Sequence, residues 1–389
     1  MGLRPHQVDG VASYDEAVRG GRRSHLIVIP TGGGKTYVFS HILQNHNGYA
    51  LATAHRNELV IQMSLSLAQC GVYHRILGAP AIASIASQVH LEEVGKCYEN
   101  PNAKVAVIGI KTLLSRADEY RSFLNKVSLY VTDEAHHVLK TNEWGRGTEL
   151  TPNAFFLGVT ATPCRSDGKG LGSHNDGIFD TLWNGPCGRD LINQGYLSPY
   201  RVVCPPNDLD LSDAKVSKRT GDFTENSIKK AVKRSHIMGD AVEHYLRFCR
   251  GMRGISFVVD IESGYELVED YIAAGVPAAM LEAKTPALER NKIIREFKEG
   301  KILQLVNKDI LGEGFDCPGA VCVSLLRPTE SFGLYSQQVG RGLRTAEGKT
   351  IAYVAVGPAS APPGEASARQ RKTVGAIALA EEPKDHAEM

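Results

Sequence analysis

Short runs of apolar residues alternate with stretches of helical spacing along most of this chain. The first five runs span residues 25–30, 49–54, 104–110, 127–134 and 154–162. Their nearly continuous apolar character is typical of strands buried on both faces of a parallel sheet. The segments between them have a helical period, as Val38, Phe39, Ile42 and Leu43 do. The pattern therefore predicts a doubly wound α/β domain over residues 1–198.

A second set of runs repeats this pattern. It spans residues 255–260, 276–281, 302–308, 320–326 and 350–356, and predicts a second α/β domain over 236–357. Residues 199–235 are rich in proline, aspartate and lysine, so we expect a basic connector there. Residues 358–389 are dominated by alanine, proline, serine and glutamate, a composition that predicts a disordered tail.

Composition excludes several classes of protein. Hydrophobic residues are 42% and charged residues 22% of the chain, as in ordinary globular proteins, and no apolar run reaches the length of a membrane span. The amino terminus is polar and resembles no signal peptide. The eight cysteines contain no CxxC pair, which favours a reducing compartment over disulfides or zinc. We therefore expect a cytoplasmic protein without a membrane partner. The net charge of +1 gives the whole chain no strong positive field, so any nucleic-acid binding would depend on a local basic groove.

The stretch IPTGGGKT, residues 29–36, lies between a predicted strand and a predicted helix. Glycines allow backbone N–H groups to surround phosphate oxygens, and the helix N-terminus adds its dipole. We expect Thr31, Gly32, Gly33, Gly34, Lys35 and Thr36 to bind a nucleotide. In this loop Lys35 would reach the β and γ phosphates and Thr36 would hold magnesium. Ile29 stands where the strict phosphate-loop pattern has its first glycine, so a glycine-rich turn beside a chance lysine is the alternative.

The stretch VTDEAHH, residues 131–137, ends another predicted strand. Two carboxylates at such a position suit metal-assisted hydrolysis: Asp133 would hold magnesium through water, and Glu134 would orient and deprotonate the attacking water. By itself an Asp-Glu pair is usually a solvated strand end. Its place downstream of a phosphate loop favours the catalytic interpretation.

Five stretches in one order resemble the motifs of superfamily 2 helicases of the DEAD/DEAH-box type. They are IPTGGGKT, VTDEAHH, GVTATPCR (158–165), LGEGFDCPG (311–319) and QQVGRGLR (337–344). The DEAH spelling and the opening LRPHQ resemble the DNA helicase and translocase branch, which includes type I and III restriction motor subunits and phage or bacterial repair helicases. The resemblance implies two tandem RecA-like P-loop domains, each a mostly parallel sheet covered by helices, with ATP and Mg²⁺ bound in a cleft between them.

The same resemblance assigns roles to further residues. Arg341 and Arg344 would be arginine fingers that stabilise charge on the γ-phosphate in the transition state, and Gln337 would lie near that phosphate. Gln7 would read adenine. Thr160 and Thr162 would couple the nucleotide site to the nucleic acid, while Gly314 and Asp316 would link ribose and strand contacts. An exposed basic helix face is the alternative for the arginines, and an ordinary polar residue is the alternative for Gln7.

Nucleic-acid contacts follow from two shorter stretches. In TAHRNEL (53–59), Arg56 would meet a backbone phosphate, and in GIKTLLSR (109–116), Thr112 would do the same. A surface arginine and a helix-capping threonine are equally good readings. The basic stretches 215–220 and 228–236 would line the groove beside DNA, although a charge run is usually a solvated face.

The chain departs from the family pattern at Lys308, where a smaller residue is expected, and in the low-complexity stretch after Val356. The resemblance implies an ATP-dependent DNA helicase or translocase, expected to be monomeric, in a bacterial or phage-infected cell. An RNA helicase of the same superfamily shares every ATP residue and remains open. The third hypothesis is an ATP-gated motor subunit that acts with a partner nuclease or repair protein.

Overall fold

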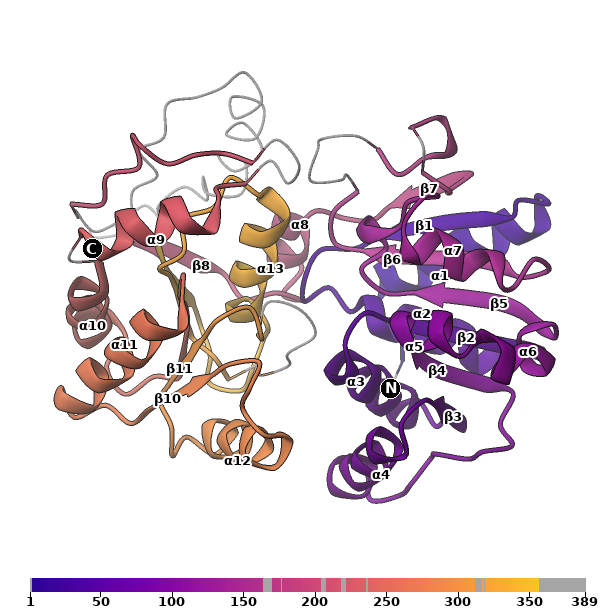
Figure 1. The fold of residues 1–389 in the computed structure, drawn as a ribbon, viewed down its shortest axis with the longest axis horizontal. Coiled ribbons are helices and arrows are strands. Elements are labelled where there is room, and N and C mark those ends of the chain that lie inside the picture. The colour runs from indigo at the N-terminus through magenta and orange to yellow at the C-terminus, as the bar shows by residue number, and fades with distance from the viewer. Residues whose placement is uncertain are drawn as a thin grey trace, which may run out of the picture. The chain divides into compact units, whose positions relative to one another are not determined.

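The computed structural model describes residues 2–163, 170–175, 177–203, 208–217, 222–235, 237–311, 317 and 319–356, without the side chains of 175, 237–239, 287–288 and 356. The chain divides after Cys187 into two compact units, each of which is described by itself (Figure 1). Gly314, Asp316 and the expected disordered tail lie outside the described residues.

The first unit is built on a parallel sheet. Within its described residues the sheet has seven strands in the order β3-β4-β2-β5-β6-β1-β7. The strands are β1 (Ser24–Val28), β2 (Tyr49–Ala54), β3 (His74–Leu77), β4 (Val105–Gly109), β5 (Val127–Thr132), β6 (Phe155–Thr160) and β7 (Thr181–Asn184). All five strands predicted here are confirmed. The pattern missed β3 and β7, which are the short edge strands.

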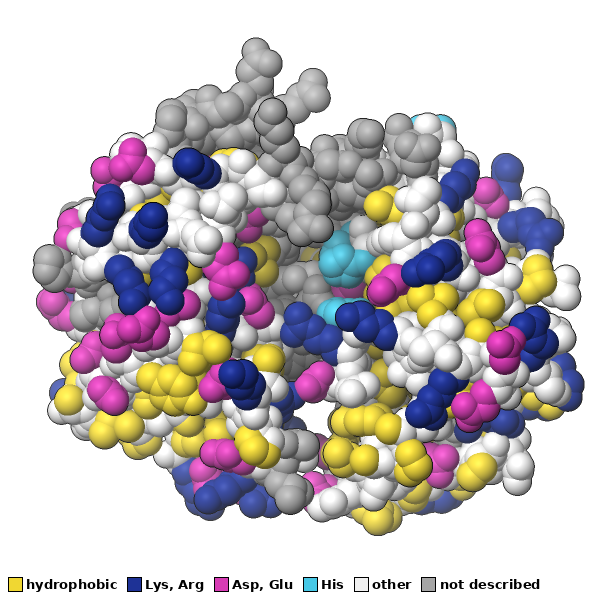
Figure 2. Space-filling view, viewed as in Figure 1, with side chains coloured by type: hydrophobic (Ala, Val, Ile, Leu, Met, Phe, Trp, Pro, Cys, Tyr) yellow, Lys and Arg dark blue, Asp and Glu magenta, His cyan; other side chains and the backbone are white. Residues whose placement is uncertain are grey.

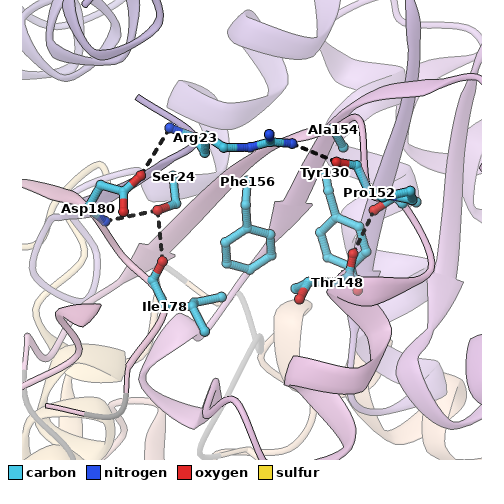
Figure 3. Close-up of a pocket in the computed structure, with 10 residues that line it drawn as sticks. Arg23, Ser24, Tyr130, Thr148, Pro152, Ala154, Phe156, Ile178 and Asp180 are labelled. Atoms are coloured by element: carbon cyan, nitrogen blue, oxygen red, sulfur yellow. Dashed lines mark hydrogen bonds between the residues drawn. The ribbon is translucent and has the colours of Figure 1, made fainter. Parts of the chain in front are cut away.

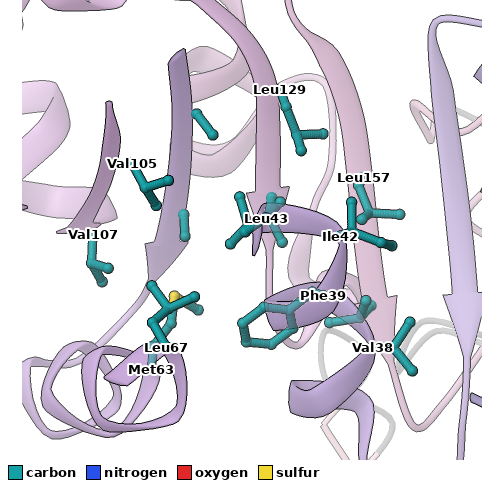
Figure 4. Close-up of a cluster of buried hydrophobic side chains, with 14 of the residues drawn as sticks. Val38, Phe39, Ile42, Leu43, Met63, Leu67, Val105, Val107, Leu129 and Leu157 are labelled. Carbon is teal, nitrogen blue, oxygen red and sulfur yellow. The ribbon is translucent and has the colours of Figure 1, made fainter. Parts of the chain in front are cut away.

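Helices cover both faces of this sheet (Figure 1). They are α1 (Pro5–Arg19), α2 (Lys35–Asn45), α3 (Asn57–Gln69), α4 (Pro80–Val94), α5 (Ile110–Ser115), α6 (Ala117–Leu124) and α7 (Glu143–Glu149), with short 3₁₀ turns at Ala135–His137 and Ser173–Asn175. Because side chains alternate along a strand, Ile27 packs into one core and Leu26 into the other. The apolar positions expected on α2 are all buried in the first core, against α3 and the strands (Figure 4).

The second unit repeats this plan. In its described part six parallel strands lie in the order β10-β11-β9-β12-β13-β8. They are β8 (Tyr200–Val203), β9 (Gly254–Phe257), β10 (Ala278–Leu281), β11 (Gln304–Asn307), β12 (Cys322–Leu325) and β13 (Ala352–Val356). The five strands predicted for this region are confirmed, and β8 was missed.

The helices of the second unit divide between the two faces of its sheet. They are α8 (Gly188–Asn193), α9 (Glu225–Lys233), α10 (Ile237–Phe248), α11 (Ile261–Ala273), α12 (Ala287–Lys298) and α13 (Phe332–Gly342). Buried side chains of α9, α10 and α11 form one core, and those of α8, α12 and α13 belong to the other. The two parallel sheets with helices on both faces confirm the predicted α/β class.

The described part of the segment 199–235 belongs to the fold of the second unit and is not only a connector. Its strand β8 pairs with β13, and Ile228 and Val232 of α9 are buried in the core. The first unit ends at Cys187, before the predicted domain end at residue 198. The physical reason is that apolar residues at helical spacing within a basic segment bury one face, while the lysines stay outside. No described helix combines the length and the apolar character needed to cross a membrane.

Candidate nucleotide-binding site and arginine helix

The carboxyl edge of the first sheet collects the residues singled out from the sequence. The phosphate loop follows β1, Asp133 and Glu134 follow β5, and Thr160 ends β6. These three strands are neighbours in the order β5-β6-β1. Ligands of open α/β sheets bind outside the carboxyl ends of the strands, so this edge is the expected position for a nucleotide.

Backbone conformation shapes the phosphate loop. Gly32 and Gly34 have φ angles of 83° and 90°, which side chains with a Cβ rarely adopt. Gly34 is the N-cap of α2, and its carbonyl accepts from Tyr37 N and Val38 N. The N–H groups of Lys35 and Thr36 are therefore the ones at the helix start that face the loop. Thr31 is buried, and its hydroxyl has no hydrogen-bond partner among the described residues. An unsatisfied buried donor in such a cradle fits a phosphate oxygen.

Side chains of the first helix, α1, hydrogen-bond to carbonyl oxygens of this loop. His6 Nε2 lies 2.9 Å from Gly33 O, and because a carbonyl only accepts, that nitrogen carries the proton. Gln7 Nε2 donates to the same carbonyl at 3.3 Å and to Gly34 O at 3.4 Å. Gln7 Oε1 accepts from Arg4 N at 2.9 Å. The role of Gln7 in reading adenine stays a prediction, and here its amide supports the loop. The sequence reasoning missed His6, although it directly precedes Gln7.

Two buried groups of opposite charge meet at the edge. Lys35 Nζ lies 4.0 Å from Glu134 Oε1, and both side chains are buried. Glu134 adopts a left-handed backbone conformation with φ of 50°, which costs a residue with a Cβ about 1–3 kcal/mol and is found mainly at functional sites. Its N–H donates to Asp133 Oδ1 at 2.9 Å.

His136 extends this arrangement to the next strand. Its Nδ1 lies 3.4 Å from Glu134 Oε2 and 3.0 Å from Thr160 Oγ1. The Thr160 hydroxyl donates to Thr162 O and accepts from Thr162 N, each at 3.1 Å. Since that hydroxyl proton is used, the proton between His136 and Thr160 belongs to His136 Nδ1. Among the described residues, Glu134 is therefore close to His136 without a hydrogen bond to Oε2, and hydrogen bonds run from His136 through Thr160 to Thr162.

His136 has no predicted role in the sequence motifs described above. The signal was present, because His136 completes the DEAH spelling and lies two residues after the predicted base. Only the fold shows its partner, since Thr160 is 24 residues further along the chain.

The predicted nucleic-acid contacts lie on the same edge, on neighbouring strands. Arg56 is exposed just after β2, and Thr112 is half-buried in α5, just after β4. The ends of these strands are in register, Ala54 opposite Gly109. The structure thus brings both residues to the edge that also carries the phosphate loop. Their contacts with nucleic acid stay predictions.

The second unit carries the remaining predicted residues on and after α13. Gln337 and Arg341 are buried in its last two turns, and Arg344 is half-buried just beyond the helix end. The helix begins at the N-cap Ser331, whose hydroxyl accepts from Leu334 N at 3.3 Å. The roles of the three residues in catalysis stay predictions.

Most of the described charges on the basic segment have acidic partners within the second unit. Lys229 Nζ lies 3.6 Å from both Asp260 and Glu262, and Lys233 lies 2.6 Å from Glu262. Lys308, the departure from the family pattern, pairs with Glu225 of α9 at 2.5 Å. Over the region of α9, Figure 2 shows Lys and Arg side chains next to Asp and Glu side chains. This mixed charge weakens the case for a basic DNA groove along α9.

A pocket of about 260 Å³ in the first unit lies away from the phosphate loop (Figure 3). Its walls come from the amino ends of β1 and β6 and from α7, with Ser24, Phe156 and Thr148 among the lining residues. Arg23 and Asp180 at its rim are joined through Arg23 N and Asp180 Oδ2 at 3.0 Å. Because this is the opposite edge of the sheet, the pocket does not belong to the nucleotide site.

Comparison with known proteins agrees with this geometry. Residues 1–165 match the family described as "Type III restriction enzyme, res subunit", and residues 240–346 match "Helicase conserved C-terminal domain". The 51.5 kDa protein of Lactococcus phage (isolate 7-9) is 31% identical over 332 residues, which cover 85% of this chain and 64% of that protein.

Two further relatives have names that include an activity. The putative ATP-dependent helicase IRC3 of Saccharomyces cerevisiae is 26% identical over 388 residues, covering 92% of this chain and 53% of that protein. The DNA 3'-5' translocase XPB2 of Sulfurisphaera tokodaii is 22% identical over 381 residues, which cover 88% of this chain and 78% of that protein. The chain spans less than two thirds of the length of the phage protein and of IRC3.

Among solved structures, a fragment of a putative HsdR subunit of a type I restriction enzyme from Vibrio vulnificus YJ016 has a similar fold. The TM-score is 0.65 at 20% identity, covering 90% of this chain and 63% of that one. The predicted RecA-like fold is confirmed by this likeness. The two family matches lie in the two units of the chain and support the predicted superfamily 2 helicase family.

Proposed function

We propose that this chain is a nucleic-acid-dependent ATPase that couples ATP hydrolysis to movement along DNA or to its remodelling. The observation that carries the proposal is the buried pair of Lys35 and Glu134, 4.0 Å apart at the carboxyl edge of the first sheet. A phosphate-binding lysine beside a carboxylate base is the arrangement that phosphoryl transfer to water requires.

In this proposal each residue of the first unit has one task. The N–H groups at the start of α2 and the Lys35 ammonium bind the phosphates. Glu134, held on both sides by Lys35 and His136, accepts the proton of the attacking water. Thr36 and Asp133 are the residues that would hold magnesium, which neutralises charge between the β and γ phosphates when it is bound.

The proposal assigns the second unit a different task. Arg341 and Arg344 stabilise the charge that develops on the γ-phosphate, and Gln337 lies near that phosphate. Arginine side chains supplied in this way can be worth about 10³–10⁵ in rate. The burial of Arg341 and Gln337 on one helix supports a constrained geometry for both side chains.

DNA is the favoured track. The matching family belongs to a restriction enzyme, and XPB2 is named as a DNA translocase. Arg56 and Thr112 would hold phosphates along the edge of the first sheet, which positions a strand without reading its sequence. We propose a monomer that acts in the cytoplasm of a bacterial or phage-infected cell.

The test is the magnesium-dependent ATPase rate of the full chain without nucleic acid and with single-stranded DNA, duplex DNA, forked DNA or RNA. Stimulation by DNA is expected, and Glu134→Gln should lower the stimulated kcat by about 10²–10⁴-fold with ATP still bound. Arg341→Ala should also lower kcat. Stimulation by RNA alone would replace DNA by RNA as the substrate. A Glu134→Gln variant with the wild-type rate would refute the proposed mechanism.

A second candidate function rests on the restriction-subunit match over residues 1–165. The chain would then be a motor subunit whose product depends on a partner nuclease. In that case ATP binds, but turnover on every nucleic acid stays at the basal rate until the partner is added. Reconstitution with candidate nuclease subunits from the same genome separates this function from the first.

A further inference from the structure

Lys349 lies at the carboxyl end of α13, on the turn before β13. Its Nζ donates to three carbonyl oxygens, those of Ala320 at 2.6 Å, Gly342 at 2.5 Å and Arg344 at 2.8 Å. The last four carbonyls of a helix have no partner within the helix. An ammonium at this end satisfies one of them and complements the negative pole of the helix dipole.

Asp222 lies at the other end of α13, although it comes from the segment that precedes α9. Its Oδ2 accepts from the Thr329 hydroxyl at 2.9 Å, and its Oδ1 accepts from Glu330 N at 2.8 Å. The Thr329 oxygen in turn accepts from the N–H of the N-cap Ser331 at 3.0 Å. A carboxylate next to the amino end of a helix complements the positive pole.

We propose that Asp222 and Lys349 are positioning residues that hold α13 from both ends and thereby set the place of Arg341 and Arg344. Charge-assisted hydrogen bonds are shorter and stronger than neutral ones, so a helix held by a carboxylate and an ammonium resists sliding along its axis. The inference rests on the proposed function, because it gives the two arginines their catalytic task.

Lys349 makes a second connection. Ala320 lies two residues before β12, and in the sequence it follows the stretch that contains Gly314 and Asp316. One ammonium therefore ties the start of β12 to the turn that bears Arg344. The neighbouring N–H of Ser198 also donates to Leu343 O at 2.7 Å, which adds a neutral bond at the same helix end.

The ammonium is half-buried, and this makes its charge sensitive to alkaline pH. Burial is the main cause that lowers the pKa of Lys349 to about 8; Cys317 acts in the opposite direction, and Arg344 and Arg253 act in the same direction as burial. A neutral amine has two N–H donors for three carbonyls, so one bond is lost when the proton leaves. The hold on α13 therefore weakens as the pH rises through about 8.

The experiment measures DNA-stimulated kcat, KM and ATP affinity for the full-length wild type, Lys349→Met and Asp222→Asn. Each variant should lower kcat at least about tenfold, because a displacement of about 1 Å can cost up to about 10²-fold. ATP affinity should stay unchanged, since the phosphate loop belongs to the first unit. The matched controls Lys301→Met and Asp213→Asn change exposed charges of the second unit and should keep the wild-type kcat.

The pH profile separates positioning from folding. The wild-type kcat should fall between pH 7.5 and 9.5, and Lys349→Arg, whose guanidinium stays charged, should keep part of the rate and lose this alkaline limb. Circular dichroism reports whether each variant folds. A wild type without DNA-stimulated turnover would refute the proposed function. A stimulated wild type whose kcat is flat to pH 9.5, or folded variants with the wild-type kcat, would overturn the positioning role alone.

Discussion

The two helices that carry the candidate chemistry, α2 and α13, are built in different ways. The site at the start of α2 depends on backbone conformation, with glycines at positive φ and carbonyls that accept from the side chains of His6 and Gln7. The end of α13 depends on charged side chains from distant parts of the chain, Asp222 and Lys349. A loop that must wrap a ligand needs its N–H groups free, whereas a helix that must present a side chain needs its ends anchored.

This difference predicts different sensitivities. In the first unit, ATP affinity should be most sensitive to a side chain added at a glycine of the phosphate loop. The free energy of unfolding of this unit should be sensitive to acid, which protonates its buried neutral histidines. The arginine helix should respond most to the removal of a charge and to alkaline pH. The following predictions, from the largest expected effect to the smallest, examine the first unit and can break or sharpen this contrast.

The largest effect is expected for Gly34→Ala. The residue has a φ of 90°, and a Cβ there would collide with Gln7 Nε2. Strain of about 1–3 kcal/mol placed on the phosphate loop should lower ATP affinity by about 10–100-fold. Titration with a fluorescent ATP analogue measures this loss.

Gly71→Ala is the matched control for this substitution. Gly71 has a similar φ of 74° but has no other atoms close to the position of a new Cβ. It should lower the free energy of unfolding by about 1–2 kcal/mol and leave ATP affinity unchanged. Equal ATP affinities for the two variants would show that backbone conformation at Gly34 does not define the site.

A smaller effect is expected for His136→Ala, which removes the link between Glu134 and Thr160. Coupling through such a contact is worth about 1–2 kcal/mol, so DNA-stimulated kcat should fall about tenfold while ATP affinity is kept. His174→Ala changes an exposed histidine of the same unit and should have no effect. If His136→Ala lowered the basal and the DNA-stimulated rates equally, His136 would support Glu134 in hydrolysis and would not couple the nucleotide site to the nucleic acid.

The smallest effect concerns a buried chain of neutral hydrogen bonds in the first unit. Tyr98 N donates to His90 Nδ1 at 3.3 Å, and His90 Nε2 lies 3.0 Å from Ser64 Oγ. Ser64 Oγ lies 2.6 Å from His74 Nε2, and His74 Nδ1 lies 2.8 Å from Val72 O. Both ends fix the proton positions, so every bond is satisfied only when both histidines are neutral.

Acid should therefore destabilise the first unit. Burial lowers the pKa of His74 to about 4, below its unfolded value of 6.5. The unfolded chain then binds more protons, so this contribution to stability is complete above pH 6.5 and is lost as the pH falls toward 4. Between pH 7.5 and pH 5 the free energy of unfolding should fall by about 2 kcal/mol from His74 alone.

Tryptophan fluorescence is a suitable measurement, because both tryptophans, Trp144 and Trp183, belong to the first unit. Urea unfolding at the two pH values should show a smaller acid loss in His74→Gln than in the wild type. His41→Gln, which lies outside the hydrogen-bond chain, should keep the wild-type acid loss. If the free energy of unfolding fell by the same amount in all three proteins, protonation of His74 would not be the cause of the acid destabilisation.

Much of the fold could be predicted from local sequence. Ten strands were predicted from apolar runs because central strands of a parallel sheet are buried on both faces and are therefore continuously apolar. The edge strands β3, β7 and β8 were missed because they are short and half-polar. Glycines, a lysine and paired carboxylates indicated the candidate nucleotide site because phosphate binding and water activation restrict residue types at fixed local spacing.

The sequence by itself thus determined the class of fold, the phosphate loop and the carboxylates at the carboxyl edge of a strand. Tertiary structure alone decided which distant groups support them. Thr160 meets His136 across 24 residues, and Asp222 meets Thr329 across 107. No local spacing encodes such pairs, because a parallel sheet brings strands together in an order that differs from their order along the chain. The physical chemistry of one hydrogen bond is local, but the choice of its partner belongs to the whole fold.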